Sequence, residues 1–268
     1  MSSDIALAEL RLTTRAEHER IEHILGLDEA MPLERYGAIL SGFDAFLRAW
    51  EPRIHAALPE RLRPWYRARR RGGLASADVE WLRAVADVAP VPMNAALAAT
   101  LPLGDLAEVI GSLYVIEGSA LGGRVIAPLL KRTLGLAQGR GASYFHGFGG
   151  ETGAMWSSFR VLATLEIGDS QRDTLRACQS AKRTFAALID LFAPLAPPPQ
   201  PDPVRPEPLQ VIAPALLAAF GATRPPPLAD IHIDLPIEDD SEDDRTLVEL
   251  PLDDGGEDEG GDTQRVPL

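Results

Sequence analysis

His18 is the residue of the N-terminal part of the chain best suited to bind a metal. It lies between Thr14 and Ile21 on a mostly apolar stripe whose residues are three and four apart, as on one face of a helix. Glu22 follows one helical turn later, close enough to accept a hydrogen bond from the imidazole. A neutral histidine that binds a metal commonly gives its second ring nitrogen to such an acceptor. The same pattern is typical of a buried core histidine satisfied by a carboxylate, so these residues alone leave both interpretations open.

The second unusual stretch is YVIEGSALGGRVI, residues 114–126, which lies inside a long predicted helix. It contains Gly118, Ser119, Gly122 and Gly123 within six residues, although each glycine costs about 1 kcal/mol of helix stability relative to alanine. Such a bare helical face is explained by close helix packing, by a kink, or by a flat ligand that lies against the backbone. A histidine below a flat ring and a glycine-lined helix above it would describe a haem site with space for a diatomic gas.

These two stretches resemble a known family. The sequence LRLTTRAEHERIEHIL resembles the proximal helix of the haem oxygenase family, and LYVIEGSALGGRVI resembles its distal helix. The likeness is strongest to the bacterial branch that makes biliverdin for phytochromes. It extends over about residues 5–193 and is specific in these two motifs.

The resemblance implies a role for each matching residue. His18 would be the axial iron ligand and so the metal-binding residue, with Glu22 holding its other ring nitrogen. Arg11 would meet a haem propionate. The distal glycines would let the helix approach the ring and press dioxygen toward one meso carbon; they are Gly118, Gly122 and Gly123.

Three further positions are less well matched. Ser119 stands where mammalian members carry an aspartate that orders a proton-delivering water network, and a hydroxyl can still donate and accept a hydrogen bond. Tyr114 lies one residue out of register with a tyrosine that is common before the distal glycines. Phe185 resembles an aromatic residue of the last helix that lines the pocket, and it also fits a plain core position.

The activity that the resemblance implies is the cleavage of haem b, which would be cofactor and substrate at once. Dioxygen and electrons would convert it to biliverdin, carbon monoxide and ferrous iron. The electrons would come from an external partner, a ferredoxin or a reductase, and a bacteriophytochrome would be a possible receiver of the biliverdin.

Three other classes of function compete with this one. A haem-binding or haem-carrier protein on the same fold is the main alternative, and Ser119 motivates it. A di-iron oxygenase would need Glu-x-x-His pairs, and none of the five histidines has a glutamate three residues before it. A helical interaction module would make His18 a core residue.

The elements expected to position these residues are all helices. We predict an all-α fold with helices over about 4–26, 32–50, 51–68, 76–88, 104–135, 153–167 and 169–193, with Pro32 in the first turn of the second and Ser76 starting the fourth. A Gly-rich loop is expected over 136–152. The predicted haem oxygenase-like domain is residues 1–193.

The C-terminal part has a different composition. Thirteen of the 23 prolines fall between Pro194 and Pro236, which predicts a Pro-rich linker or an irregular wrap over 194–236. Acidic residues dominate 237–268, which predicts a disordered tail. Of the 39 acidic and 26 basic residues, 15 and 2 lie within 230–268, which leaves a body with 24 of each.

The composition also narrows the classes of partner and the compartment. A neutral body argues against nucleic-acid binding, which needs a basic face. We find no apolar run of the roughly 18 residues that a membrane span requires, and no secretory signal, so we expect a cytoplasmic protein without membrane contact. The single cysteine, Cys178, is expected to be a small core residue. The arginine cluster at 67 and 69–71 is expected to lie on a solvated loop.

Overall fold

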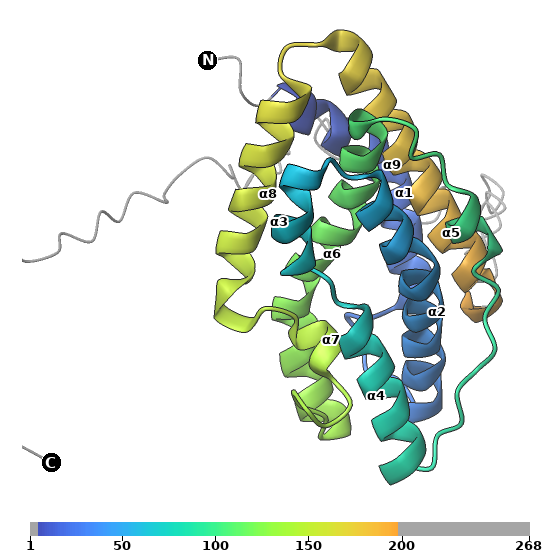
Figure 1. The fold of residues 1–268 in the computed structure, drawn as a ribbon. Coiled ribbons are helices and arrows are strands. Elements are labelled where there is room, and N and C mark those ends of the chain that lie inside the picture. Colours follow the sequence, from blue (N-terminus) through green and yellow to red (C-terminus); the bar gives the residue numbers. More distant parts are fainter. Residues whose placement is uncertain (1–4, 198–268) are drawn as a thin grey trace, which may run out of the picture. The chain divides into compact units, whose positions relative to one another are not determined.

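The computed structural model describes residues 5–197, and helices dominate this part of the chain (Figure 1). The helices are α1 (Ile5–Leu25), α2 (Leu33–Ala57), α3 (Arg63–Arg67), α4 (Gly72–Val85), α5 (Ala96–Thr100), α6 (Leu106–Leu134), α7 (Ser143–His146), α8 (Thr152–Ile167) and α9 (Gln171–Phe192), with short 3-10 turns at Glu60–Leu62, Gly149–Glu151 and Ala193–Leu195. Within residues 5–197 only isolated bridges around Ala137 have a β-type pairing. The predicted all-α class is confirmed.

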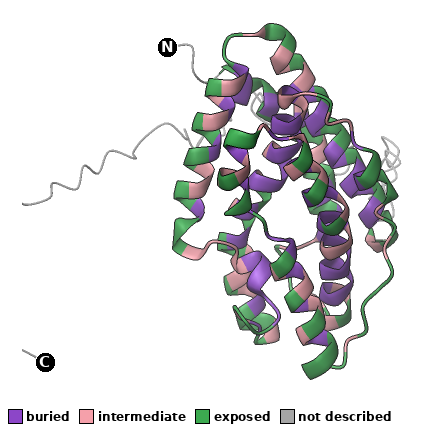
Figure 2. Ribbon diagram, in the orientation of Figure 1, coloured by how far each residue is buried: buried purple, intermediate pink, exposed green. Residues whose placement is uncertain are grey.

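Helix α9 is the common packing partner of α1 and α6. Both pack along α9, while α1 and α6 make few contacts with each other. The α6–α9 approach is close, because a Cβ on Gly111 would lie 2.0 Å from the carbonyl oxygen of Ala177. Buried residues are concentrated on the inner faces of α2, α6 and α9 (Figure 2). The common support of α9 therefore sets the relative position of α1, with His18, and α6, with its glycines.

The predicted break between the second and third helices is wrong. Helix α2 continues through Pro52 to Ala57, because Trp50 and Ile54 on either side of the proline are buried in the core. The chain then turns at Leu58 and Pro59 and forms only short helical segments up to Arg67. Packing of the apolar face outweighs the hydrogen bond that a proline removes from a helix.

The predicted start of the fourth helix at Ser76 is also wrong, because α4 begins at Gly72. The Glu51 carboxylate accepts hydrogen bonds from the backbone N–H groups of Arg71 and Gly72, each at 2.8 Å. A side chain of α2 thus satisfies the N-terminal donors of α4, which a local reading of the sequence cannot show.

The Gly-rich segment over 136–152 is more ordered than predicted, since it contains α7 and a 3-10 turn. The buried Asp78 carboxylate accepts a hydrogen bond from the backbone N–H of Tyr144 at 2.7 Å. The Tyr36 hydroxyl donates to the carbonyl of Gly141, also at 2.7 Å. Helices α2 and α4 therefore fix this segment against the core.

Helix α6 is the one helix within residues 5–197 that is long and apolar enough to cross a membrane by composition, with a mean hydropathy of 1.3 in its best window. This corrects the expectation that no stretch reaches that length. In the fold, Val109, Ile110 and Leu113 are fully buried against the rest of the protein. Core packing explains the apolar character of this part of α6.

The predicted C-terminal segments lie mostly outside the part of the chain that the structure describes. Helix α9 ends at Phe192, and a 3-10 turn follows over Ala193–Leu195. After Pro197, the predicted linker over 194–236 and the acidic tail over 237–268 lie outside the described residues.

Candidate functional site

His18 lies on the surface of α1 rather than in the core. Its side chain is 55% exposed, and its Nδ1 atom is 3.4 Å from a carboxylate oxygen of Glu22. The imidazole ring meets the ring of Phe185 on α9 edge-on, with 5.9 Å between the ring centroids. The interpretation as a buried core histidine is therefore wrong. The carboxylate stands at one ring nitrogen, and the geometry leaves Nε2 as the nitrogen for a ligand.

Several residues that surround His18 are buried. Thr14 and Ile21 of α1 are buried, and Phe185 of α9 is only 4% exposed. Phe185 is thus both a core residue and the aromatic neighbour of the histidine, so the two interpretations of this position are compatible.

Arg11 and Tyr114 lie close enough to influence each other across α1 and α6. Burial raises the pKa of the half-buried Tyr114 phenol, and the Thr14 hydroxyl and the Arg11 charge oppose that rise. The Tyr114 ring also packs near Trp156, with 5.9 Å between centroids. The structure therefore brings two of the candidate haem-contacting residues to the same region, beside buried Thr14.

The glycines of α6 serve different purposes. A Cβ on Gly123 would lie 2.0 Å from the carbonyl oxygen of Phe145, so α7 requires a glycine at this position. A Cβ on Gly118 would meet only the ring of Trp156, at 3.9 Å, and one on Gly122 only Ile126 of its own helix, at 3.4 Å. The protein's own packing explains Gly123 but gives no reason for glycine at 118 and 122, where the backbone stays bare.

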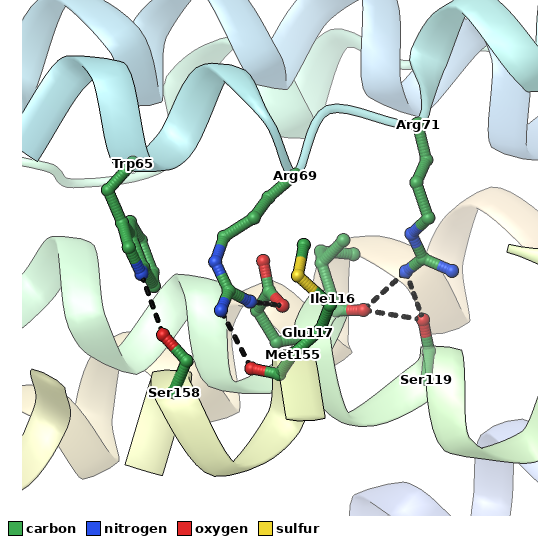
Figure 3. A network of polar contacts seen from close by, with 8 residues as sticks. All are labelled: Trp65, Arg69, Arg71, Ile116, Glu117, Ser119, Met155 and Ser158. Carbon is green, nitrogen blue, oxygen red and sulfur yellow. Dashed lines mark hydrogen bonds and ion pairs between the residues drawn. The ribbon is translucent and has the colours of Figure 1, made fainter. Parts of the chain in front are cut away.

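Ser119 takes part in a hydrogen-bond cluster on the same turn (Figure 3). Its hydroxyl donates to the carbonyl of Ile116 at 2.8 Å. The Arg71 guanidinium, which lies between α3 and α4, donates to the same carbonyl at 2.5 Å and to the Ser119 Oγ at 3.0 Å.

A second buried arginine holds the neighbouring residue of α6. Arg69 donates to the Glu117 carboxylate at 2.6 Å and to the carbonyl of Met155 on α8 at 2.7 Å (Figure 3). Its guanidinium lies over the ring of Trp65, 4.1 Å from the centroid. Burial raises the pKa of Glu117, whereas Arg69 and then Arg71 oppose the rise.

The expectation of a solvated arginine loop is therefore wrong for Arg69 and Arg71, which are each 4% exposed. Arg67 is exposed as expected, and Arg70 is partly exposed in an ion pair with Glu51. The sequence did contain a signal for this, since Glu117 is the one charged residue between Val109 and Gly123, and a carboxylate buried in such a stretch needs a positive partner.

The donor set fits haem better than a protein-bound metal ion. Within residues 5–197, no three side chains of histidine, cysteine, aspartate or glutamate come together as a metal site. Iron in haem needs only one histidine from the protein, because the porphyrin supplies four nitrogens. His18 offers that ligand, and the bare backbone at Gly118 and Gly122 offers a surface for a flat ring. A cavity of about 720 Å³ between α2 and α4 contains none of these residues.

Cys178 is a buried free thiol, as predicted, and burial raises its pKa. His23 is exposed on the surface of α1.

Comparisons with known proteins point in the same direction. The family model described as "Heme oxygenase" matches residues 77–194. A protein of Xanthomonas campestris pv. campestris (strain 8004) named "Heme oxygenase" is 31% identical over 170 residues, which cover 62% of this chain and 92% of that protein. The NO- and CO-bound heme oxygenase of Neisseria meningitidis has a similar structure, with a TM-score of 0.53 and 21% identity over 70% of this chain and 92% of the other. The family-model match contains α6 and its glycines but begins after α1, so it does not include His18.

Proposed function

The chain belongs to the haem oxygenase family, and on this premise we propose that it is an active enzyme that cleaves haem with dioxygen and electrons to biliverdin, carbon monoxide and ferrous iron. The observation that carries this proposal is the pairing of a half-exposed histidine with a bare helical backbone on a second helix. His18 on α1 keeps one ring nitrogen for a ligand, and Gly118 and Gly122 on α6 leave room for a flat ring.

When bound, haem supplies the iron that binds dioxygen and the ring carbon that is oxidised. The chain's own residues have simpler tasks. His18 provides a nitrogen ligand, and the Glu22 carboxylate near its Nδ1 helps to hold the ring in orientation. The Phe185 ring of α9, nearly perpendicular to the imidazole, limits the rotation of the imidazole from that side.

On the α6 side, the backbone at Gly118 and Gly122 provides a steric wall without side chains. Such a wall restricts the direction in which a small gaseous ligand can lie. Arg11 carries the positive charge suited to a haem carboxylate, and Tyr114, which its charge influences, provides a protonated hydroxyl near the same region.

The finer parts of the proposal rest on the resemblance of the two motifs to the bacterial branch. We propose a ferredoxin or a reductase as electron donor and a bacteriophytochrome as one receiver of the biliverdin. The cytoplasm as the compartment is a separate proposal, which the single cysteine, Cys178, supports. The neutral charge balance of residues 1–229 supports a partner that is not a nucleic acid.

A non-catalytic haem-binding protein is the second candidate, and one observation favours it. The Ser119 hydroxyl donates its only proton to the Ile116 carbonyl, so this side chain does not itself deliver a proton to a ligand. A haem carrier needs His18 and the bare helix but no proton delivery.

Turnover distinguishes the two candidates. The purified protein is mixed with hemin under air, ascorbate or a ferredoxin–reductase pair is added, and the visible spectrum and carbon monoxide release are recorded. We expect the Soret band to decay into the broad absorption of biliverdin, with one carbon monoxide per haem. A Soret band that persists under effective reduction would contradict the enzyme and support the haem carrier.

A further inference from the structure

Arg71 reaches the glycine-bearing turn of α6 from a distant part of the sequence. It lies between α3 and α4, is 4% exposed, and ends on the backbone of Ile116 and the side chain of Ser119 (Figure 3). One guanidinium nitrogen makes both contacts, at 2.5 Å to the carbonyl and 3.0 Å to the hydroxyl oxygen. Each of its two hydrogens therefore has a separate acceptor.

The hydrogen-bond inventory of Ser119 shows what this contact does. A serine hydroxyl has one proton and two lone pairs. The proton goes to the Ile116 carbonyl, because a carbonyl only accepts, and one lone pair takes the Arg71 N–H, because a guanidinium only donates. One lone pair remains. Ser119 is exposed on α6, so this remaining lone pair is open to a ligand or an ordered water.

Arg71 is itself held in place. Its guanidinium lies 5.1 Å from the centroid of the buried Tyr144 ring, and its backbone N–H donates to Glu51. The Tyr144 hydroxyl is buried and makes no hydrogen bond of good geometry within residues 5–197, but the Ser119 hydroxyl lies near enough to oppose the rise that burial causes in the pKa of Tyr144. Arg71 is thus a donor that the surrounding protein holds in place. The unsatisfied hydroxyl in this cluster is that of Tyr144, and such a group is commonly satisfied by an ordered water.

We propose that Arg71 is a positioning residue of the distal site, which fixes the Ser119 hydroxyl in one rotamer so that Ser119 presents an acceptor, not a donor, to the ligand side. This inference rests on the proposed function, because it takes the surface of α6 at Gly118 and Gly122 as the distal wall of haem. It also gives Ser119 a role in turnover: an acceptor oriented in this way holds a water by one hydrogen and turns the other toward the bound gas.

Arg69 provides a matched control for this role. Arg69 is buried to the same extent and lies in the same segment between α3 and α4. Its guanidinium binds Glu117, two residues before Ser119, and makes no hydrogen bond to Ser119. Replacing either arginine by lysine keeps the charge, but the ammonium nitrogen ends one bond short of the guanidinium nitrogens that make these contacts. Differences between Arg71→Lys and Arg69→Lys therefore report on the contact with Ser119.

The test uses carbon monoxide as a probe on the ferrous haem complex of the full chain, with the C–O stretching band recorded by infrared spectroscopy. We expect one narrow band for the wild type and for Arg69→Lys. We expect a broadened or split band for Arg71→Lys, because a released Ser119 hydroxyl samples several orientations. The double variant Arg71→Lys with Ser119→Ala should return to one band at the position of Ser119→Ala alone, since no rotor remains.

Three results would overturn the inference: identical bands for Arg71→Lys and Arg69→Lys, a split band that persists without Ser119, or an unshifted band in Ser119→Ala. The last variant changes only an exposed hydroxyl, so it decides the matter even if Arg71→Lys fails to fold. A protein that binds haem and carbon monoxide but does not cleave haem contradicts the proposed function alone. A protein that forms no haem complex contradicts both.

Discussion

The two sides of the candidate site are built in opposite ways. On α1, His18 is half-exposed, its contact with Glu22 lies at the surface, and the nearby Arg15–Glu19 pair has both side chains more than half exposed. On α6, the side chains of Arg69 and Glu117 are 2% and 7% exposed, and Arg71 is as deeply buried. The difference implies that the exposed charged residues of α1 can be altered with little effect on folding, whereas changes at the buried charges beside the α6 turn affect folding and function together.

The largest expected effect on stability is at the buried ion pair. Arg69→Met leaves the Glu117 carboxylate buried without its partner, and breaking such a pair costs about 3–5 kcal/mol of unfolding free energy. Arg15→Met is the matched change on α1, where solvent screens the pair, and we expect no measurable loss. Urea unfolding of the two variants checks this contrast. Equal losses would show that α1 and α6 do not differ in the way described.

The glycines of α6 allow a sharper test within one helix. Gly123→Ala places a methyl group on the carbonyl of Phe145, and such overpacking costs about 1–3 kcal/mol. Gly122→Ala meets only Ile126 of its own helix, so it should stabilise the haem-free protein by up to about 1 kcal/mol while it weakens haem binding.

Thermal unfolding without haem and hemin titration separate these two effects. A Gly122→Ala variant that binds hemin as tightly as the wild type would show that the bare backbone at 122 does not face the ring.

A smaller effect is expected at the carboxylate beside His18. Glu22→Gln keeps the shape but removes the charge near Nδ1. Partners of metal-ligating histidines contribute about 10–100-fold in affinity, and an exposed one belongs at the lower end. Hemin titration should show this loss with an unchanged melting temperature. A loss as large as that of His18→Ala would mean that Glu22 itself binds the ligand.

The smallest effect is expected from truncation after Pro197. The family-model match ends at residue 194, and every candidate site residue precedes it. Turnover of hemin by residues 1–197 should equal that of the full chain in the same assay. A large loss would assign the C-terminal segment a part in the reaction.

The sequence predicted those features that depend on local spacing. The helix expected over 4–26 is observed as Ile5–Leu25, and the one over 104–135 as Leu106–Leu134, because both carry long apolar stripes. The contact of His18 with Glu22 also follows from positions four apart on one helix.

The predictions that were wrong concern features that depend on partners far away in the sequence. The start of α4 at Gly72 requires Glu51 of α2, and the burial of Arg69 and Arg71 requires Glu117 and Ile116 of α6. No local pattern encodes these pairs. The buried Glu117 was the one sign that a positive side chain must reach α6.

We expect His18 to be the ligand that attaches haem to this protein. The measurement is a hemin titration of the wild type, His18→Ala and His23→Ala, followed at the Soret band, with imidazole added back to His18→Ala. His23 is an exposed histidine of the same helix and is therefore the matched control. We expect His23→Ala to bind hemin as the wild type does, and His18→Ala to lose the wild-type spectrum and regain it with imidazole. An unchanged Soret band in His18→Ala would show that another group holds the iron.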